Sequence, residues 1–387
     1  MVRLKDIAKI TAGQAAPKEF TNTGLPFIRA GHLEDLLSGL DIDSLPKVSE
    51  KVARTKRLKR IPKGTILFAK SGMSATKNRV YITGADAYFV SHLAGILPNT
   101  QFSTSYLSRF LSWYNPSKLI LDSAYPSIRL EDINNLKIPL PPLDQQKQIA
   151  SILDTADAYR QKTKALIDKY DALTQSLFLD MFGDSWLNPN NFPLKMLRDL
   201  VNDGKIITYG IVQAGEHIDN GIPYIRTGDI KDGKIITKGL KRTSNEIAQA
   251  YKRSKCSAGD IIMSIRATVG TIAFLPNSLH GANLTQGTAR ISTDKNKANP
   301  IYLFHCIKSE GIQLKINRQT KGATFREITL TRLRTIKVPI PPLVLQNQFA
   351  ERIKAIEAQK ALAQKELNKA DELFNSLLQQ AFKGELV

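Results

Sequence analysis

At 387 residues the chain is too long for one ordinary core, so two or three folding units are expected. The hydrophobic fraction of 42 % is normal for a globular protein, and no stretch approaches the roughly 18 continuous apolar residues of a membrane-spanning helix. The formal charge of +20 is not normal, and it favours an anionic polymer such as DNA or RNA, or an anionic surface, as the partner.

Cysteine usage and the N-terminus indicate the compartment. Cys256 and Cys306 are the 2 cysteines, and neither has a histidine or cysteine at zinc-ligand spacing beside it. Neither a disulfide framework nor a structural zinc is therefore expected. The chain runs from Met1 into a mixed polar pattern without the apolar segment of a secretory signal. We expect a cytoplasmic protein.

The first 142 residues have the pattern of a sheet-rich domain. Runs rich in Ile, Val and aromatic residues occur at 64–69 and 79–83 and are bounded by Gly, Asn and Pro. Such runs are typical of strands with irregular connections. Helices are sparse in this region, and the best candidate is 105–113. We predict a domain of the α+β class.

A proline-rich motif closes this region and precedes a long helical pattern. Residues 137–143 read Lys-Ile-Pro-Leu-Pro-Pro-Leu. Beyond them apolar or small residues recur three and four positions apart, which predicts a helix with one packing seam. About 36 residues without a helix breaker give a rod of about 54 Å. Gly183 stands where a C-terminal stop is expected. The seam residues are Ile149, Leu153, Ala156, Thr163, Ile167, Tyr170, Leu177 and Met181.

The whole pattern then occurs a second time. Residues 337–343 repeat the motif as Lys-Val-Pro-Ile-Pro-Pro-Leu at an offset of 200, and the match continues without a gap from Gln146 and Gln346 to Phe182 and Phe382. Upstream, 24–31 corresponds to 221–228 and 64–67 to 259–262, while strands are indicated at 259–265 and 271–275 and a helix at 300–308. The second seam is Phe349, Ile353, Ile356, Ala363, Leu367, Ala370, Phe374, Leu377 and Ala381, followed by a stop at Gly384. The chain is therefore an internal duplication.

Two long helices of equal length and matching register favour pairing with each other. Because a domain of about 150 residues separates them, an antiparallel coiled coil with pseudo-twofold symmetry is the natural arrangement. The alternative is that each helix packs only against its neighbouring domain. We predict two sheet-rich α/β domains at 1–142 and 185–342, and helices at 143–184 and 343–387.

The positive charge is segregated into the two variable domains. Residues 143–187 hold five basic and seven acidic side chains and residues 343–387 hold six of each, so the two domains carry +22. Basic residues are concentrated at 51–70, 231–255 and 308–337. Such clusters suit contacts to phosphates, which position a protein on nucleic acid without reading its sequence. The domains, and not the helices, are therefore predicted to meet the anion.

Base reading needs forked or bidentate donors on loops that can enter a groove. Loops of this kind are predicted at 69–79 and 264–270, and further ones precede each proline motif at 125–129 and 321–326. Turn capping is the alternative role for any one of these polar groups. The candidates for nucleic-acid contact are Arg29, Arg57, Lys59, Arg60, Lys70, Ser71, Lys77, Asn78, Arg79, Ser127, Arg129, Arg226, Lys241, Arg242, Arg253, Arg266, Thr268, Lys321, Thr324 and Arg326.

No motif for catalysis is found. The chain has neither the glycine-rich loop and Asn/Asp-Pro-Pro-aromatic motif of a methyltransferase nor a Walker-type phosphate loop. No carboxylate cluster suits a metal-dependent nuclease. The histidines are scattered and are expected to be ordinary surface or core residues: His32, His92, His217, His280 and His305. We predict neither a catalytic residue nor a metal site.

The order of variable domain, Lys-x-Pro-x-Pro-Pro-Leu-x-x-Gln motif and long helix, present twice, resembles the DNA-specificity subunit of Type I restriction-modification systems. The resemblance is strongest in residues 138–148 and 338–348, and residues 24–31 and 221–228 support it. The resemblance implies two target recognition domains, each reading one half of a bipartite, asymmetric site, with the helices setting the gap. This sequence departs from the pattern where Asp144 and Gln145 become Val344 and Leu345, which puts identical docking at both helices in doubt.

The resemblance also implies partners. Two methyltransferase subunits would dock on the helical segments, and restriction subunits would add translocation and cleavage. The cofactors S-adenosylmethionine, ATP and magnesium would belong to those partners and not to this chain. The residues expected to bind the methyltransferase are Gln146, Gln148, Ile149, Leu153, Gln346, Gln348, Phe349 and Ile353.

Two other functions stay open at this point. One is a stand-alone enzyme that modifies or cleaves DNA with catalytic residues that no motif reveals. The other is an RNA-binding scaffold, which competition between duplex DNA and single-stranded RNA would distinguish, because groove reading requires B-form geometry.

Overall fold

The computed structural model describes residues 1–322 and 326–386. The chain forms two compact units, one of residues 1–164 together with those from 365 onward, and one of residues 165–364. The division falls inside the two longest helices, α6 (Leu143–Phe182) and α11 (Leu343–Lys383). Each unit therefore contains part of both helices.

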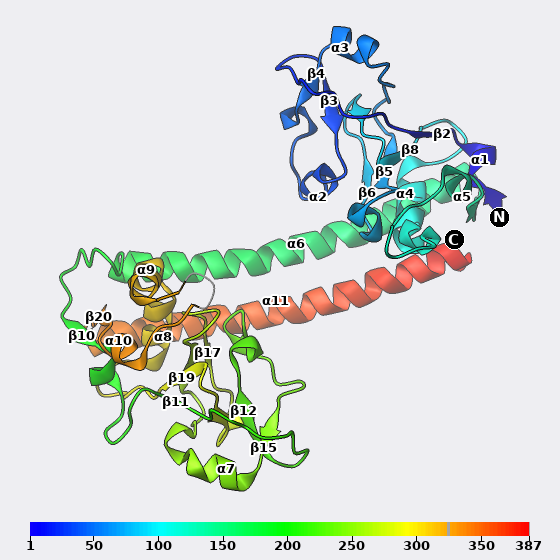
Figure 1. Ribbon diagram of the computed structural model, residues 1–387. Coiled ribbons are helices and arrows are strands. Elements are labelled where there is room, and N and C mark those ends of the chain that lie inside the picture. The colour runs from blue at the N-terminus through cyan, green and yellow to red at the C-terminus, as the bar shows by residue number, and fades with distance from the viewer. Residues whose placement is uncertain (323–325, 387) are drawn as a thin grey trace. The chain divides into compact units, whose positions relative to one another are not determined.

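The first unit is built on small sheets (Figure 1). Its four-stranded antiparallel sheet has the order β2 (Ile10–Ala12), β8 (Leu93–Ile96), β5 (Ile66–Ala69) and β6 (Val80–Ile82). Its three-stranded sheet has the order β4 (Lys47–Val48), β3 (Leu25–Ile28) and β7 (Tyr88–Phe89), and β3 runs parallel to β7. A further pair joins β1 (Val2–Arg3) to β9 (Lys137–Ile138). The strands expected at 64–69 and 79–83 are β5 and β6, so both are confirmed.

Short helices connect these strands. They are α1 (Leu4–Ile7), α2 (His32–Leu37), α3 (Glu50–Thr55), α4 (Thr104–Tyr114) and α5 (Leu130–Asn134). The helix expected at 105–113 is α4, which packs at β6 (Figure 1). The six-residue helices α2 and α3 were not predicted, because fewer than two turns show too little periodicity to be detected.

The second unit repeats the same strand orders. Its four-stranded sheet has the order β11 (Thr208–Tyr209), β19 (Thr288–Ile291), β16 (Ile261–Ser264) and β17 (Ile272–Phe274). Its three-stranded sheet has the order β15 (Arg242–Thr243), β12 (Ile222–Ile225) and β18 (Asn283–Leu284). A further pair joins β10 (Leu194–Met196) to β20 (Lys337–Pro339). It adds a hairpin of β13 (Ile230–Lys231) and β14 (Lys234–Ile235). Its helices are α7 (Asn245–Ala250), α8 (Pro300–Lys308), α9 (Glu310–Gln319) and α10 (Leu330–Arg334). The strands at 259–265 and 271–275 and the helix at 300–308 are confirmed.

Inside the first unit the beginning of α6 lies against the end of α11. The Arg160 guanidinium donates from Nε to Asp371 at 2.7 Å, and the Phe382 ring lies 5.6 Å from that of Tyr106 in α4. Ile149 and Leu153 of α6 share the buried core with Phe374 and Phe382 of α11. Both helices therefore help to close the core of this domain.

The second unit shows the reciprocal arrangement. Here the end of α6 meets the beginning of α11: Lys360 pairs with Asp171, and Phe182 lies 5.3 Å from Phe349. The ion pairs Arg160–Asp371 and Lys360–Asp171 are related by the 200-residue offset. In both units the helices pair antiparallel, as the seams predicted.

The seam residues predicted for both helices are all buried or half-buried. The helices have 40 and 41 residues, somewhat more than the stretch of about 36 residues that lacks helix breakers in the sequence. Gly183 and Gly384 follow the last helical residues with φ of +73° and +82°, the left-handed conformation that ends a helix. Within the described residues no helix combines the length and apolar character that crossing a bilayer requires.

Candidate nucleic-acid interface

The loop between β5 and β6 is joined to a segment far away in sequence. The Gly72 N–H donates to the Pro126 carbonyl at 2.9 Å, and the Ile128 N–H donates to the Lys70 carbonyl at 2.7 Å. Ser71 and Ser127 lie opposite each other in an isolated antiparallel bridge. The predicted loops 69–79 and 125–129 therefore form one continuous edge, called here the first reading edge.

The second unit has the same backbone arrangement between β16 and β17. The Ala267 N–H donates to the Arg326 carbonyl at 2.9 Å, and the Ile328 N–H donates to the Ile265 carbonyl at 3.0 Å. Arg266 lies opposite Glu327. Residues 265–270 and 326–328 form the second reading edge. Thr324, another predicted contact, lies outside the described residues.

Ala267 takes the place of Gly72 in this repeated backbone. Both residues have positive φ, +72° at Gly72 and +56° at Ala267. An alanine in this conformation costs about 1 kcal/mol relative to glycine. The turn is therefore maintained in the second edge against local preference by the hydrogen bonds on both sides of it.

Carboxylates and other acceptors hold most of the candidate arginines in place. Arg266 donates from Nε to Glu327 at 3.0 Å and lies 3.0 Å from the same oxygen through Nη2. Arg226 forms a forked pair with Asp229, at 3.0 and 2.8 Å. A guanidinium fixed along one edge keeps its remaining N–H groups free to point outward. The other held groups are Arg60 by Asp86, Arg79 by Glu34, Arg242 by the Gly221 carbonyl and Arg326 by Asn317.

The side chains of other candidate contacts interact with groups of their own domain. The Asn78 amide donates to the Ser112 carbonyl at 2.6 Å, and Thr268 lies 3.3 Å from the Ser264 hydroxyl. Ser71 pairs with the ring of His92. The Arg29 guanidinium lies 5.0 Å from the centre of the Phe20 ring. Each has a structural task that the sequence did not reveal.

A second group of candidates carries charge into solvent. Within residues 1–322 and 326–386 their side chains have no hydrogen bond or ion pair, and all except the half-buried Lys70 are exposed. They are Arg57, Lys59, Lys70, Lys77, Arg129, Lys241, Arg253 and Lys321. Exposed, unpaired cations of this kind suit phosphate contacts. Ser127 is also exposed, but it carries no charge.

The acidic residues that orient the arginines were missed in the sequence. Asp86 is the clearest case, because the Arg60 guanidinium and the Lys63 N–H hold the pKa of its carboxyl below the usual range. Asp229 follows Arg226 by three residues, a spacing that could have indicated a local pair. Glu34 lies 45 positions from Arg79 and Glu327 lies 61 from Arg266, so no local pattern predicts these two pairs.

Six of the eight side chains expected to bind a partner lie inside this chain's own packing. Ile149, Leu153, Phe349 and Ile353 are at most 4 % exposed, since they form the domain cores. Gln146 and Gln346 are at most 1 % exposed. These six were predicted to bind the methyltransferase, but their side chains are buried in the packing of this chain. Gln148 and Gln348 are exposed.

The two buried glutamines explain part of the proline motif. Gln146 accepts the Ser103 N–H at 2.9 Å and donates to the Pro141 carbonyl at 2.8 Å. Gln346 does the same with the Asn299 N–H at 2.8 Å and with the Pro341 carbonyl at 2.6 Å. The motif therefore fastens the N-terminus of α4 or α8 to the beginning of the long helix.

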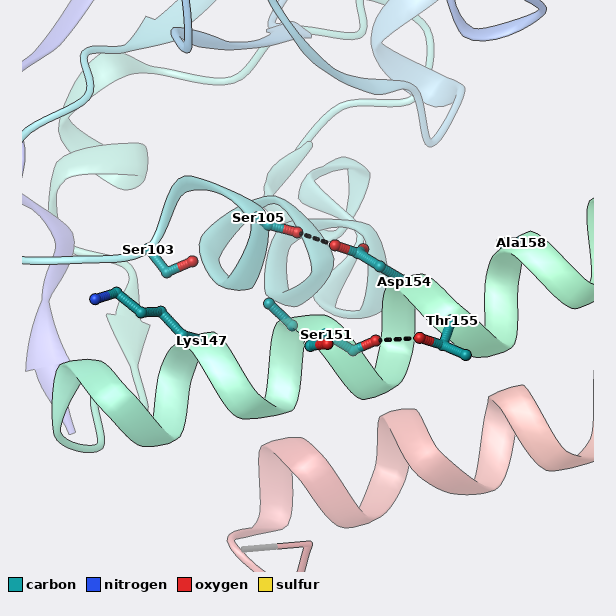
Figure 2. A pocket seen from close by; sticks show the side chains of 8 residues that line it. Ser103, Ser105, Lys147, Ser151, Asp154, Thr155 and Ala158 are labelled. Carbon is teal, nitrogen blue, oxygen red and sulfur yellow. Dashed lines mark hydrogen bonds between the residues drawn. The ribbon is translucent and has the colours of Figure 1, made fainter.

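One shallow groove of about 490 Å³ lies on the exposed side of this junction in the first unit (Figure 2). The Ser105 hydroxyl donates to Asp154 at 2.8 Å, and Arg109 donates to the same carboxylate at 2.9 Å. The lining is rich in small and hydroxyl-bearing side chains: Ser103, Ser105, Lys147, Ala150, Ser151, Asp154, Thr155 and Ala158.

No site for metal chemistry is seen in the described part of the chain, where no three His, Cys, Asp or Glu side chains lie together as possible ligands. His305 packs edge-on against Phe349 and Phe304, and burial lowers its pKa to about 4. Burial raises the pKa of the Cys306 thiol to about 12. Both groups are therefore neutral near pH 7, Cys306 inside the core and the half-buried His305 at its border.

Comparison with known proteins agrees with this architecture. A family model described as the Type I restriction modification DNA specificity domain matches residues 1–169 and 195–372. The EcoBI specificity subunit of Escherichia coli is 28 % identical over 317 residues, which span 74 % of this chain and 66 % of that protein, just under two thirds of its length. The putative MjaX specificity subunit of Methanocaldococcus jannaschii is 25 % identical over 406 residues, covering 99 % of this chain and 92 % of that one.

Among solved structures, the S subunit of the Type I restriction-modification system from M. genitalium has the same fold. The TM-score is 0.57 at 15 % identity, with 98 % of this chain and 95 % of that chain covered. At this identity the likeness concerns the fold.

Proposed function

Because this chain belongs to the Type I restriction modification DNA specificity domain family, we propose that it reads a bipartite, asymmetric DNA site for a restriction-modification complex. Residues 1–142 and 185–342 are the two target recognition domains, and each reads one half of the site. Residues 143–184 and 343–387 are the helical segments that set the gap between the halves. Sequence is read at the two reading edges, and the unpaired cations contact phosphates.

The repeated backbone of the two reading edges carries this proposal. The same hydrogen bonds hold residues 70–72 to 126–128 and residues 265–267 to 326–328. The side chains at the paired positions differ, with Ser71 and Ser127 in the first edge and Arg266 and Glu327 in the second. A constant frame that presents different donors is what two readers of different base sequences require. The relatives named above are called specificity subunits of Type I restriction enzymes, which supports the same function.

The second part of the proposal concerns the partners that bind α6 and α11. Two copies of a methyltransferase subunit dock on the exposed faces of α6 and α11, which include Gln148 and Gln348. S-adenosylmethionine, and ATP and magnesium where a restriction subunit joins, belong to those partners. The two docking faces are chemically unequal, since Ser151 and Asp154 of the first correspond to Glu351 and Lys354 of the second.

A gap-insertion experiment tests the proposal. The modified motif is first mapped by methylation sequencing of DNA exposed to the chain with its native methyltransferase subunits. Duplexes with one to five base pairs added between the half-sites are then compared with the natural spacing. We expect binding and methylation to fall steeply with each insertion, because continuous helices of 40 and 41 residues fix the separation. Undiminished recognition at every spacing would contradict the role of the helices.

A further inference from the structure

The residue that precedes β8 in the first unit and β19 in the second differs in its side chain, although the backbone hydrogen bonds around it are the same. The Lys70 N–H donates to the His92 carbonyl at 2.8 Å, and the Ile265 N–H donates to the Gly287 carbonyl at 2.9 Å. His92 and Gly287 both precede the corresponding strands β8 and β19. The two residues are therefore structural equivalents.

The side chains at this position supply different hydrogen-bonding groups. In the first unit the Ser71 hydroxyl lies 2.7 Å from Nδ1 of the exposed His92 ring. In the second unit the place of Ser71 is taken by Arg266, which Glu327 holds along the Nε and Nη2 edge. In both units a neighbouring polar group thus fixes the orientation of the side chain, His92 in the first and the half-buried Arg266 in the second.

The second unit leaves little space for a side chain at residue 287. A Cβ atom on Gly287 would lie 2.9 Å from Cγ2 of Thr227 and 4.0 Å from Cβ of Arg266. In the first unit the residue that corresponds to Thr227 is the smaller Ala30, and Arg266 is replaced by Ser71. The large side chain is therefore at residue 92 in the first domain, and at residue 266 in the second domain, where Thr227 crowds residue 287. We name the set Ala30, Ser71 and His92 the first corner, and the set Thr227, Arg266 and Gly287 the second corner.

We propose that these corners are specificity-determining positions: His92, oriented by Ser71, contacts a base in the first half-site, and Arg266, oriented by Glu327, contacts a base in the second. This inference rests on the proposed function. The Nη groups of Arg266 suit the O6 and N7 acceptors of guanine in the major groove. Nε2 of His92 supplies one hydrogen bond to a base edge.

The test is selection of bound duplexes from a randomised pool by the full chain with its native methyltransferase subunits, followed by sequencing. The variants are His92→Gly, which introduces the residue of the second corner, His92→Gln and Arg266→Lys. His280→Gln, which removes another exposed imidazole outside both corners, is the control. Melting temperatures identify any variant that fails to fold, and His92→Gln then serves in place of His92→Gly.

We expect each His92 variant to lower discrimination roughly 5- to 100-fold at one base position of one half-site, and Arg266→Lys to do so at one position of the other half. His280→Gln should leave both base preferences unchanged. An unchanged motif in the folded His92 and Arg266 variants would overturn this inference alone. A wild-type complex that selects no bipartite motif would overturn the proposed function and this inference together.

Discussion

The side-chain oxygen of Gln146 accepts a hydrogen bond of 2.9 Å from the backbone N–H of Ser103, the residue that caps α4. The same relationship joins Gln346 to Asn299 at the beginning of α8. In both units a buried amide therefore joins the recognition domain to its long helix. The second bond of each glutamine, to Pro141 or Pro341, fastens the proline motif as well.

Gln146→Leu should destabilise the first unit by about 1–3 kcal/mol, because it leaves the Ser103 N–H and the Pro141 carbonyl without their buried partner. The measurement is the shift in melting temperature by calorimetry. Gln148→Leu is the matched control, since Gln148 is exposed two residues further along α6 and its loss should cost less than about 0.5 kcal/mol. Equal effects of the two substitutions would show that the bonds of the buried amide do not stabilise this junction.

The offset-related ion pairs across the helices should differ in strength. Arg160 pairs with Asp371, also bonds Asp157 at 2.8 Å and lies 4.5 Å from the centre of the Phe374 ring, whereas Lys360 pairs with Asp171. Arg160→Ala should therefore cost about 1–2 kcal/mol and Lys360→Ala less than about 1 kcal/mol. Thermal unfolding of the two variants at low and at physiological salt measures the difference. A larger loss for Lys360→Ala would contradict this ranking.

His305 should make folding stability depend on pH. Its pKa is lowered to about 4 by burial, whereas the unfolded residue titrates near 6.5. The folded state therefore excludes a proton that the unfolded state binds, so this contribution is complete above pH 6.5 and is lost as the pH falls towards 4. The shift corresponds to about 3 kcal/mol at most. His305→Phe should show a smaller fall in melting temperature between pH 7.5 and 4.5 than the wild type.

His280→Gln is the control for this pH dependence. His280 is an exposed histidine of the same unit, whose Nδ1 accepts the Ala258 N–H at 3.3 Å. The effect is assigned to His305 if His305→Phe reduces the pH dependence more than His280→Gln does. An identical pH dependence in wild type and His305→Phe would mean that folding does not change the pKa of His305, so that the ring takes up a proton in the folded protein as readily as in the unfolded one.

The sequence predicted the elements that extend over many residues. The seams of α6 and α11, their glycine stops and the duplicated motif are all periodic or repeated features, and all were confirmed in the structure. Short helices such as α2 and α7 were missed, because six residues give too little pattern. The repeated spacing around Gln146 was visible in the sequence. Its structural role was not, because its partner Ser103 lies 43 positions away.

The candidate site was predicted at the level of loops and not of atoms. The loops at 69–79 and 264–270 carry the expected donors, but the sequence did not indicate that each joins the segment before the proline motif. Whether an arginine such as Arg79 is free or held depends on a carboxylate 45 positions away, Glu34. Long-range pairs of this kind form only when the chain is folded, so composition and spacing do not reveal them.

Phosphate contacts should be distinguishable from base contacts by their salt dependence. Lys59 and Lys77 are exposed and have no partner within the described residues. If both contact phosphates, the double variant Lys59→Gln and Lys77→Gln should reduce the slope of log affinity against log salt by about 2 and weaken all sequences alike. Binding titrations at several salt concentrations, with cognate and unrelated duplexes, measure both effects.

Lys5→Gln is the control, because Lys5 is an exposed lysine of α1 outside the basic clusters. It should leave the slope of log affinity against log salt unchanged. A change in base preference with an unaltered slope would instead place Lys59 and Lys77 among the base contacts.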